Sequence, residues 1–425
     1  MVERTVFIYL PGETEAVPAG RLTMIEQGLH VQASTFAYGR RYVTRANALP
    51  VDPVALALVP GRVDEERVPA GGLAVFGALR DATPDAWGRR VIENRLRAPP
   101  NGLPESVYLD HAGPHRAGAL DVRASPTSLP AGSALPSVLD LRHLLDAAAR
   151  VEEGEPVPAH LEVFFAGGPS VGGARPKAVV TVDGREWIAK FPARNDPFNV
   201  PLIERTTLEL ARKAGLNAPR TRMETLADGR QVMLIDRFDR EPLAHGMGRR
   251  HMISALTLLA LHEQDSPDSS YAAIADAMSL HGVSGQIASD RNELFARMVF
   301  NILVSNDDDH LRNHAFLFDA EGGGWRLSPL YDVVPRPQLA QERMLHLSIG
   351  PRGRLARLDN ALAGAGRFGL LPPDAARIID RVVRAVRSWR DTFEGLGVPV
   401  RECDRVASAF RRATDIGMRD VDRQL

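Results

Sequence analysis

The chain has 425 residues, of which 44% are hydrophobic and 25% charged, as in ordinary globular proteins, and it is long enough for two or three subdomains. Its formal net charge of −1 excludes binding of nucleic acid through overall positive charge, and its single cysteine excludes an intramolecular disulfide and a cysteine-based zinc site. The N-terminus lacks a signal-peptide pattern, and no apolar run reaches the ~20 residues of a membrane span. We therefore expect a cytoplasmic protein that makes no contact with membranes.

Residues 1–110 form the first predicted part, a small mixed subdomain with several strands. Short apolar runs such as RTVFIYL alternate there with glycines and prolines. The stretch GALRDATPDAWGRRVIENRL predicts a helix that begins near Pro84, with Asp81 or Thr83 as its cap. Residues 97–138 collect Pro, Gly, Ser and Ala without periodicity, which predicts a linker or a long surface loop.

Residues 111–245 form the second predicted part, which contains a loop rich in glycine and serine. The loop, FFAGGPSVGGARPK, leads into two strands joined by an Asp183-Gly184 turn, and the far strand carries Lys190. The segment PLIERTTLELARKAG then predicts a helix that ends at Gly215. A second hairpin is expected around Asp228-Gly229.

Lysine is rare in this chain. Only Lys177, Lys190 and Lys213 are lysines, and every other basic residue is arginine. A lysine in such a background can mark a place that needs a compact ammonium group instead of a planar guanidinium. Lys213 fits an exposed helix end, whereas Lys177 and Lys190 flank the strands that follow the glycine-rich loop.

Residues 246–425 form the third predicted part, which is mainly helical. ELFARMVFNILVSN has one apolar helical face and leads into the polar stretch DDDHLRNH, residues 307–314. AFLFD and WRLS predict a hairpin, and Asp332 lies just beyond it. Further amphipathic helices complete the chain.

These parts together match what phosphoryl transfer from ATP requires. The reaction needs backbone amides and a lysine on the phosphates, a carboxylate that faces the attacking hydroxyl, and oxygen ligands for Mg²⁺. Asp308 and Asn313 have the five-residue spacing of the catalytic loop of protein kinases, and Asp332 can supply the second metal-binding group. The ordered combination is much less expected by chance than any single piece.

A competing interpretation of DDDHLRNH is a metal site for a hydrolase. His310 and His314 lie four residues apart, so on a helix they could share a metal with Asp307 or Asp309. This interpretation leaves the glycine-rich loop unexplained. We therefore expect His310 to be a structural residue that holds backbone by hydrogen bonds, and His314 to be buried at a strand start.

In order and spacing, SVGGARPKAVV, WIAKFP, LIDRFDR, NILVSNDDDHLRNHAFL and LSPLYDVVP resemble the motifs of HipA-like serine/threonine kinases. These are the toxins of bacterial HipBA-type toxin–antitoxin modules. The resemblance runs from about residue 40 to residue 335. It implies an α+β, two-lobed, protein-kinase-like fold with a β-rich N-terminal part and a mainly helical C-terminal lobe.

The resemblance also assigns roles within an ATP and Mg²⁺ site. Asp308 would be the catalytic base, and Asn313 and Asp332 would hold Mg²⁺. Lys190 would contact the phosphates, oriented by Glu204 or Glu209. The other residues expected at the nucleotide are those of the loop and its end, those of the connector between the lobes, and a loop histidine: Ser170, Val171, Gly172, Gly173, Ala174, Lys177, Asp236, Phe238 and His310.

Regulation and partners are implied by the resemblance alone. Ser170 matches the position at which the family is autophosphorylated, and a phosphate there would expel the loop from the ATP site. The family implies an aminoacyl-tRNA synthetase as substrate and a small helix-turn-helix antitoxin of HipB type as partner. Contact with DNA would be indirect, through that antitoxin.

Two other functions remain open at this stage. A small-molecule kinase could have the same lobes, because the phosphoryl-transfer residues do not reveal the acceptor. A binding module without activity could hold the antitoxin, although Lys190, Asp308, Asn313 and Asp332 together argue against it.

Overall fold

The computed structural model describes residues 1–59, 65–130, 135–158, 161 and 173–425. The chain divides into two compact units, which we call the first and the second unit. The first unit comprises Met1–Arg194 and Glu224–Ala260, and the second comprises Asn195–Met223 and Leu261–Leu425. Within the described ranges, no helix combines the length and the apolar character that crossing a membrane requires. The proposed part boundaries at residues 110 and 245 stay a prediction.

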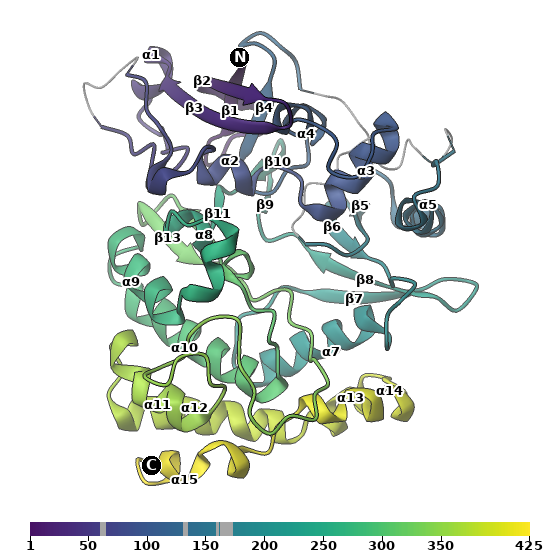
Figure 1. Ribbon diagram of the computed structural model, residues 1–425, viewed down its shortest axis with the longest axis vertical. Helices are drawn as coiled ribbons and strands as arrows, with labels where there is room; N and C mark the ends of the chain where they lie inside the picture. The colour runs from purple at the N-terminus through teal and green to yellow at the C-terminus, as the bar shows by residue number, and fades with distance from the viewer. Residues whose placement is uncertain (60–64, 131–134, 159–160, 162–172) are drawn as a thin grey trace. The chain divides into compact units, whose positions relative to one another are not determined.

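A four-stranded antiparallel sheet opens the first unit, in the order β3-β2-β1-β4 (Figure 1). Its strands are β1 (Val2–Tyr9), β2 (Ala16–Gln27), β3 (His30–Tyr38) and β4 (Leu120–Arg123). The run from Val6 to Tyr9 is buried throughout, which explains why this apolar segment forms a central strand. The same unit contains the helices α1 (Arg40–Val43), α2 (Gly77–Asp81), α3 (Ala86–Leu96) and α4 (Glu105–His111).

Two expectations for this region are wrong. Residues 97–138 are not one loop, because they contain α4 and β4, with Tyr108 and Leu120 in the core. The helix predicted to begin near Pro84 is confirmed as α3, but its predicted cap is wrong: neither Asp81 nor Thr83 but Asp85 caps it, by accepting a hydrogen bond from the backbone nitrogen of Gly88 at 2.8 Å. Asp81 instead accepts hydrogen bonds from Ser254. Asp81, which the local pattern assigned as a helix cap, therefore bonds instead to a residue distant in sequence.

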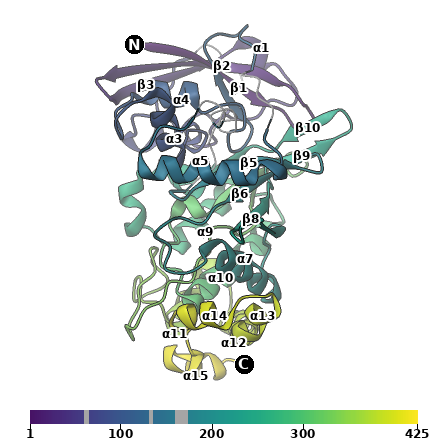
Figure 2. The ribbon, with the colours of Figure 1, turned by 90° about the vertical axis from the view of Figure 1, so that its right-hand side faces the viewer.

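The second sheet has the order β5-β6-β8-β7 and confirms both predicted hairpins. Its strands are β5 (Lys177–Val182), β6 (Arg185–Lys190), β7 (Thr221–Thr225) and β8 (Gln231–Asp236). Asp183 and Gly184 both have positive φ, 49° and 74°, as a tight hairpin turn requires. Helix α5 (Leu141–Glu153) lies along this sheet (Figure 2), and its apolar face shares a core with Trp87, Val180 and Val232. The remaining elements of the unit are β9 (Arg240–Leu243), β10 (Gly246–Arg249), β11 (Met252–Ser254) and α8 (Ala255–Leu258).

The second unit is built around α10 (Ile287–Val304), as the apolar run before the aspartates predicts. Its residues from Leu294 to Val304 are all buried, and it packs against α9 (Tyr271–His281) and α12 (Pro372–Arg387). Helix α7 (Val200–Lys213) ends before Gly215 as predicted, and β12 (Ala315–Asp319) pairs with β13 (Gly324–Leu327) in the expected hairpin. The other helices are α11 (Leu358–Gly364), α13 (Trp389–Gly395), α14 (Val400–Val406) and α15 (Met418–Asp422).

Candidate active site

The polar stretch between α10 and β12 folds into a compact loop. Ser305 ends α10 with a φ of 52°, which turns the chain sharply. The backbone oxygen of Asp308 then accepts two hydrogen bonds, from the backbone nitrogen of His310 at 2.9 Å and from Nδ2 of Asn313 at 3.1 Å. The structure thus brings together the two residues that the five-residue spacing singled out, and it leaves Oδ1 of Asn313 facing away from that bond.

Asp309 is the buried anchor of this loop. Its carboxylate is 1% exposed and accepts hydrogen bonds from the Tyr271 hydroxyl at 2.5 Å, from Nδ2 of Asn301 at 2.7 Å and from Nε2 of His314 at 2.9 Å. Burial raises the pKa of Asp309, but the His314 charge and the hydrogen bonds outweigh it, so this pKa lies below its usual range. The sequence showed three equivalent aspartates, and the structure makes the third a structural residue.

Asp308 is the accessible carboxylate of the three. Its side chain is 56% exposed, and Oδ2 lies 2.5 Å from Nη2 of Arg336. Asp307 accepts a hydrogen bond from Gln338 at 2.5 Å, and partial burial together with the neighbouring charge of Asp308 raises its pKa. Asp308 is therefore the carboxylate best placed to meet a substrate hydroxyl, and Arg336 is a site residue that the sequence patterns did not reveal.

Asp332 has an unusual backbone. Its φ is 59°, in the left-handed region that a non-glycine residue adopts only when its surroundings impose it. The preceding residues are fixed, since the Leu330 backbone nitrogen donates to Asn217 at 2.7 Å and the Tyr331 hydroxyl donates to the backbone oxygen of Arg312 at 2.6 Å. Strain of this kind is concentrated at functional sites, which is consistent with the predicted metal-binding role.

The two histidines do not form the shared metal site of the competing interpretation. His314 is fully buried just before β12, as expected, and its Nε2 is bonded to Asp309. The His310 ring packs edge-on against His346. Its Nδ1 has no hydrogen-bond partner among the described residues, so this atom does not make the hydrogen bond to backbone that we expected. In the described part of the chain, no three His, Cys, Asp or Glu side chains are grouped to hold a metal.

Lys177 and Lys190 are directly opposite each other in the first unit, as paired residues of β5 and β6. Lys177 is 2% exposed, and its Nζ lies 3.0 Å from Oδ2 of Asp85, the residue that caps α3. Lys190 is half-buried. Like charges that face each other across a sheet are unfavourable unless anions compensate them. Asp85 compensates Lys177, and the predicted contact of Lys190 with phosphates stays a prediction.

The glycine-rich loop meets this lysine pair at its described end. Gly173 has a φ of 117°, and a Cβ built on it would lie 2.7 Å from Nζ of Lys177, so only glycine fits. Ala174 is exposed in the bend that follows. Ser170, Val171 and Gly172 lie outside the described residues, and their expected contact with phosphates stays a prediction.

The segment after β8 is held by a buried group of charges. Arg237 and Arg240 both bond to Glu186 and Asp239, and Arg237 also donates to backbone oxygens of residues 115 and 116. Despite burial, which raises them, the pKa values of Glu186 and Asp239 lie far below their usual range, that of Glu186 because of its hydrogen bond with His115 and then the two arginines, that of Asp239 because of the arginines. The network fixes the segment that carries Asp236, which is buried, and Phe238, which is half-buried. Their predicted adenine contacts stay untested.

The two candidate partners of Lys190 differ in their own surroundings. Glu209 accepts a hydrogen bond from the Thr221 hydroxyl at 3.0 Å and pairs with Arg212, whereas Glu204 is 1% exposed within α7. The pairing of either glutamate with Lys190 stays a prediction.

The chain is similar in sequence to a family of known proteins. A family model described as "HipA-like C-terminal domain" matches residues 169–390, about half of the chain. Y4mE of Sinorhizobium fredii, provisionally named a kinase, is 28% identical over 40% of this chain and 40% of its own length. The serine/threonine-protein kinase toxin HipA of Shewanella oneidensis is 25% identical over 52% of this chain and 55% of its own length. These matches thus span about half the length of the curated relatives.

A solved structure resembles nearly the whole chain. It is the Shewanella oneidensis toxin–antitoxin complex of HipA, HipB and operator DNA, which matches with a TM-score of 0.67 over 98% of this chain and 97% of that chain. The sequence identity is 16%, so the likeness concerns the fold. It confirms the predicted α+β fold.

Proposed function

This chain belongs to the family of proteins with a HipA-like C-terminal domain, and we propose that it is a protein serine/threonine kinase that uses ATP and Mg²⁺. The observation that carries the proposal is the loop geometry, in which the exposed carboxylate of Asp308 and the amide of Asn313 are joined through the backbone oxygen of Asp308. Lys190, which is half-buried in β6 of the first unit, would supply positive charge for the ATP phosphates.

The residues fit a magnesium ion. Because Nδ2 of Asn313 donates to backbone, its Oδ1 remains as a ligand, and Asp332 adds a carboxylate from a strained backbone position. Amide and carboxylate oxygens are ligands that Mg²⁺ accepts. When bound, the ion would neutralise charge on the phosphates.

The chain's own residues then have distinct tasks. Asp308 accepts the proton of the substrate hydroxyl while the hydroxyl oxygen bonds to the γ-phosphorus and the bond from that phosphorus to ADP breaks. Lys190 neutralises the phosphates, and Arg336 orients Asp308 through their ion pair. Asp309 stabilises the loop through its hydrogen bonds to buried protein groups, and for the same reason it takes no part in proton transfer.

The substrate and partners follow from the relatives. The related HipA is named a toxin, and the similar structure contains HipB and operator DNA. We propose that this chain is likewise the toxin of such a pair, that it binds a HipB-like antitoxin and reaches DNA through it, and that it acts on a translation component such as an aminoacyl-tRNA synthetase. Autophosphorylation of Ser170 is part of the same proposal.

The first test is intact-mass spectrometry of the phosphatase-treated full chain, before and after incubation with ATP and Mg²⁺. We expect one added phosphate that is absent in Ser170→Ala. In Asp308→Asn, the rate of phosphate incorporation should fall by about 10²- to 10⁴-fold, the usual contribution of a general base. Asp276→Asn is the matched control, because Asp276 is an exposed aspartate of α9 paired only with Arg367 at the surface.

Other outcomes separate the alternatives. Full activity in Asp308→Asn would remove the assignment of the base. No added mass in the wild type, with a sugar or aminoglycoside phosphorylated instead, would favour a small-molecule kinase. No detectable ATP binding by calorimetry would favour an inactive module that binds an antitoxin.

A further inference from the structure

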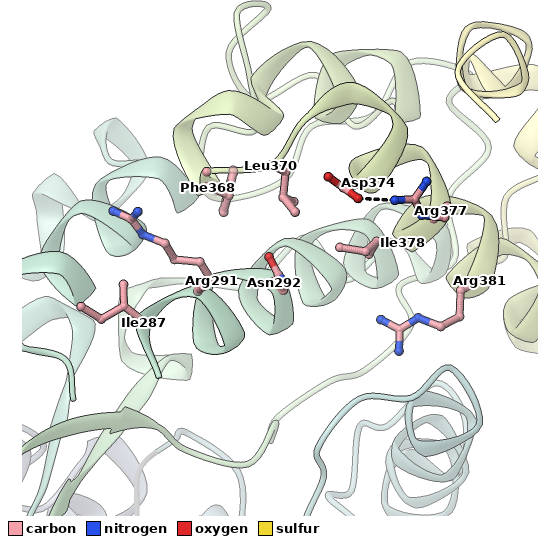
Figure 3. Close-up of a pocket in the computed structure, with 11 residues that line it drawn as sticks. Ile287, Arg291, Asn292, Phe368, Leu370, Asp374, Arg377, Ile378 and Arg381 are labelled. Atoms are coloured by element: carbon pink, nitrogen blue, oxygen red, sulfur yellow. Dashed lines mark hydrogen bonds and ion pairs between the residues drawn. The ribbon is translucent and has the colours of Figure 1, made fainter. Parts of the chain in front are cut away.

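A cavity in the second unit is lined by none of the residues assigned above. It has a volume of ≈ 760 Å³ and lies between the first turns of α10 and the segment from Phe368 to Arg381 (Figure 3). Leu370 and Ile378 from that segment face Asn292 of α10 across the space. None of its lining residues belongs to the loop that holds Asp308. The cavity therefore needs an explanation of its own.

Its charged lining is unbalanced. Three arginines face it, Arg291, Arg377 and Arg381, but only one carboxylate, Asp374, which is paired with Arg377 on the same helix. Neither Arg291 nor Arg381 has a carboxylate partner among the described residues. Two positive charges are thus left at the cavity, with Arg291 and Arg381 toward opposite ends of its lining (Figure 3).

Both unpaired arginines contact neutral acceptors, and Arg291 is the more firmly held. Nε of Arg291 donates to the backbone oxygen of Ala275 at 2.9 Å, and its Nη2 donates to the Ser279 hydroxyl. Nη1 of Arg381 reaches the backbone oxygen of Gly215 at 3.4 Å, where α7 has ended. A guanidinium that is positioned without being neutralised loses little side-chain freedom when it binds an anion, and it keeps further N–H groups to donate.

The floor of the cavity is apolar. Ile287, Phe368, Leu370 and Ile378 supply it, and Phe368 and Leu370 are themselves buried. Pockets of about 300–1,000 Å³ with apolar walls and a few charged groups are typical of sites for small molecules. The floor suits an apolar or aromatic body, and the arginines suit a phosphate or carboxylate attached to it.

We propose that this cavity binds a small anionic molecule that joins an apolar or aromatic body to a phosphate or carboxylate group, as an effector site separate from the ATP site. The proposal does not depend on kinase activity. It predicts that 1-naphthyl phosphate, which has this chemistry, binds the full chain, and that inorganic pyrophosphate, which lacks the apolar body, binds more weakly.

The experiment is calorimetric titration of 1-naphthyl phosphate and 1-naphthoate into the full chain that carries Lys190→Met, which weakens the ATP site. We expect one site, and about tenfold loss of affinity in Arg291→Gln/Arg381→Gln, because the anionic group of the probe then loses its charge-assisted hydrogen bond whichever of the two arginines it pairs with. The matched control is Arg377→Gln, whose charge Asp374 already balances, and it should change affinity by less than about threefold. The naphthoate titration distinguishes a carboxylate site from a phosphate site.

A second variant tests the site independently, in case the double arginine variant does not fold. Ala288 is exposed on α10 and lines the cavity, so Ala288→Trp should fill the space and abolish binding without disturbing the core. Unchanged affinity in both Arg291→Gln/Arg381→Gln and Ala288→Trp, or no binding of either naphthyl probe to the parent chain, would overturn the proposal.

Discussion

The loop of residues 306–314 and the open end of the β5–β6 hairpin each contain a pair of neighbouring like charges, and the two regions stabilise them with partners from different parts of the chain. Each presents two like charges together, Asp308 with Asp309 and Lys177 with Lys190, and in each pair one charge is deeply buried with its partners while the other is more exposed. The loop takes its partners from Tyr271, Asn301 and His314 in its own unit. In the hairpin, Lys177 pairs with Asp85, which lies 92 residues earlier in the chain. The comparison teaches that burial, and not residue type, separates the structural charge from the functional one.

The largest effect should come from removing the buried carboxylate of the loop. Asp309→Ala leaves Tyr271, Asn301 and His314 without their shared acceptor, so we expect a loss of about 3–5 kcal/mol in the stability of the second unit. Hydrogen exchange of the α10 amides measures it, because α10 is the core helix of that unit.

Asp276→Asn serves as the control, since this exposed ion pair should contribute less than about 1 kcal/mol. Wild-type protection of the α10 amides in Asp309→Ala would show that the loop does not depend on the buried Asp309 carboxylate. The proposed structural role of Asp309 would then be wrong.

The hairpin should respond less, through Lys177→Met. Asp85 would lose its charge partner in a buried setting, and we expect a loss of about 2–4 kcal/mol, measured as faster hydrogen exchange of β5 and β6 amides. Adding Asp85→Asn should recover part of this loss, because the uncompensated carboxylate is then gone.

Lys190→Met makes the comparison sharper. It should raise the KM for ATP, and because it also removes the like charge that faces Lys177, it should change hydrogen exchange in the hairpin less than Lys177→Met does. If Lys177→Met instead raises that KM without changing hydrogen exchange, Lys177 contacts the phosphates and the assigned roles of the two lysines do not hold.

The smallest expected effect is a difference between the two units in how much stability each loses at acidic pH. Burial lowers the pKa of His251 in the first unit to about 4, below the ~6.5 of an unfolded histidine. The unfolded chain therefore binds more protons between these values, and stability falls as pH drops from about 6.5 toward 4. At pH 5.5 the loss should be about 1 kcal/mol.

In the second unit, the pKa of Asp309 is lowered, so its contribution is complete above the ~3.9 of an unfolded aspartate and is lost only at lower pH. Burial also lowers the pKa of His346 in the second unit, so that unit loses some stability over the same pH range. Region-resolved hydrogen exchange at pH 7 and pH 5.5 should show the larger loss in the first unit, because His251 is buried and His346 is half-buried. His251→Gln should remove this pH dependence, and an equal slope in that variant would assign the effect to other groups.

Local pattern predicted much of the secondary structure. Asp183-Gly184 and Asp228-Gly229 marked real turns, and the apolar periodicity before Asn306 marked the buried helix α10. It failed for residues 97–138, where the short strand β4 is stabilised by pairing with β1 and carries little signal of its own. It also misassigned Asp81, whose hydrogen bonds go to Ser254.

By itself, the sequence determined which residues could take part in the chemistry, because the order and spacing of Lys190, Asp308, Asn313 and Asp332 are properties of the chain. The tertiary structure alone decided how residues of the same type differ in burial and in partners. Three aspartates in a row look alike until Tyr271, Asn301 and His314 converge on Asp309, and two lysines look alike until Asp85 neutralises Lys177. The physical reason is that a buried charge must find partners, those partners come from distant segments, and only folding brings them within hydrogen-bond distance.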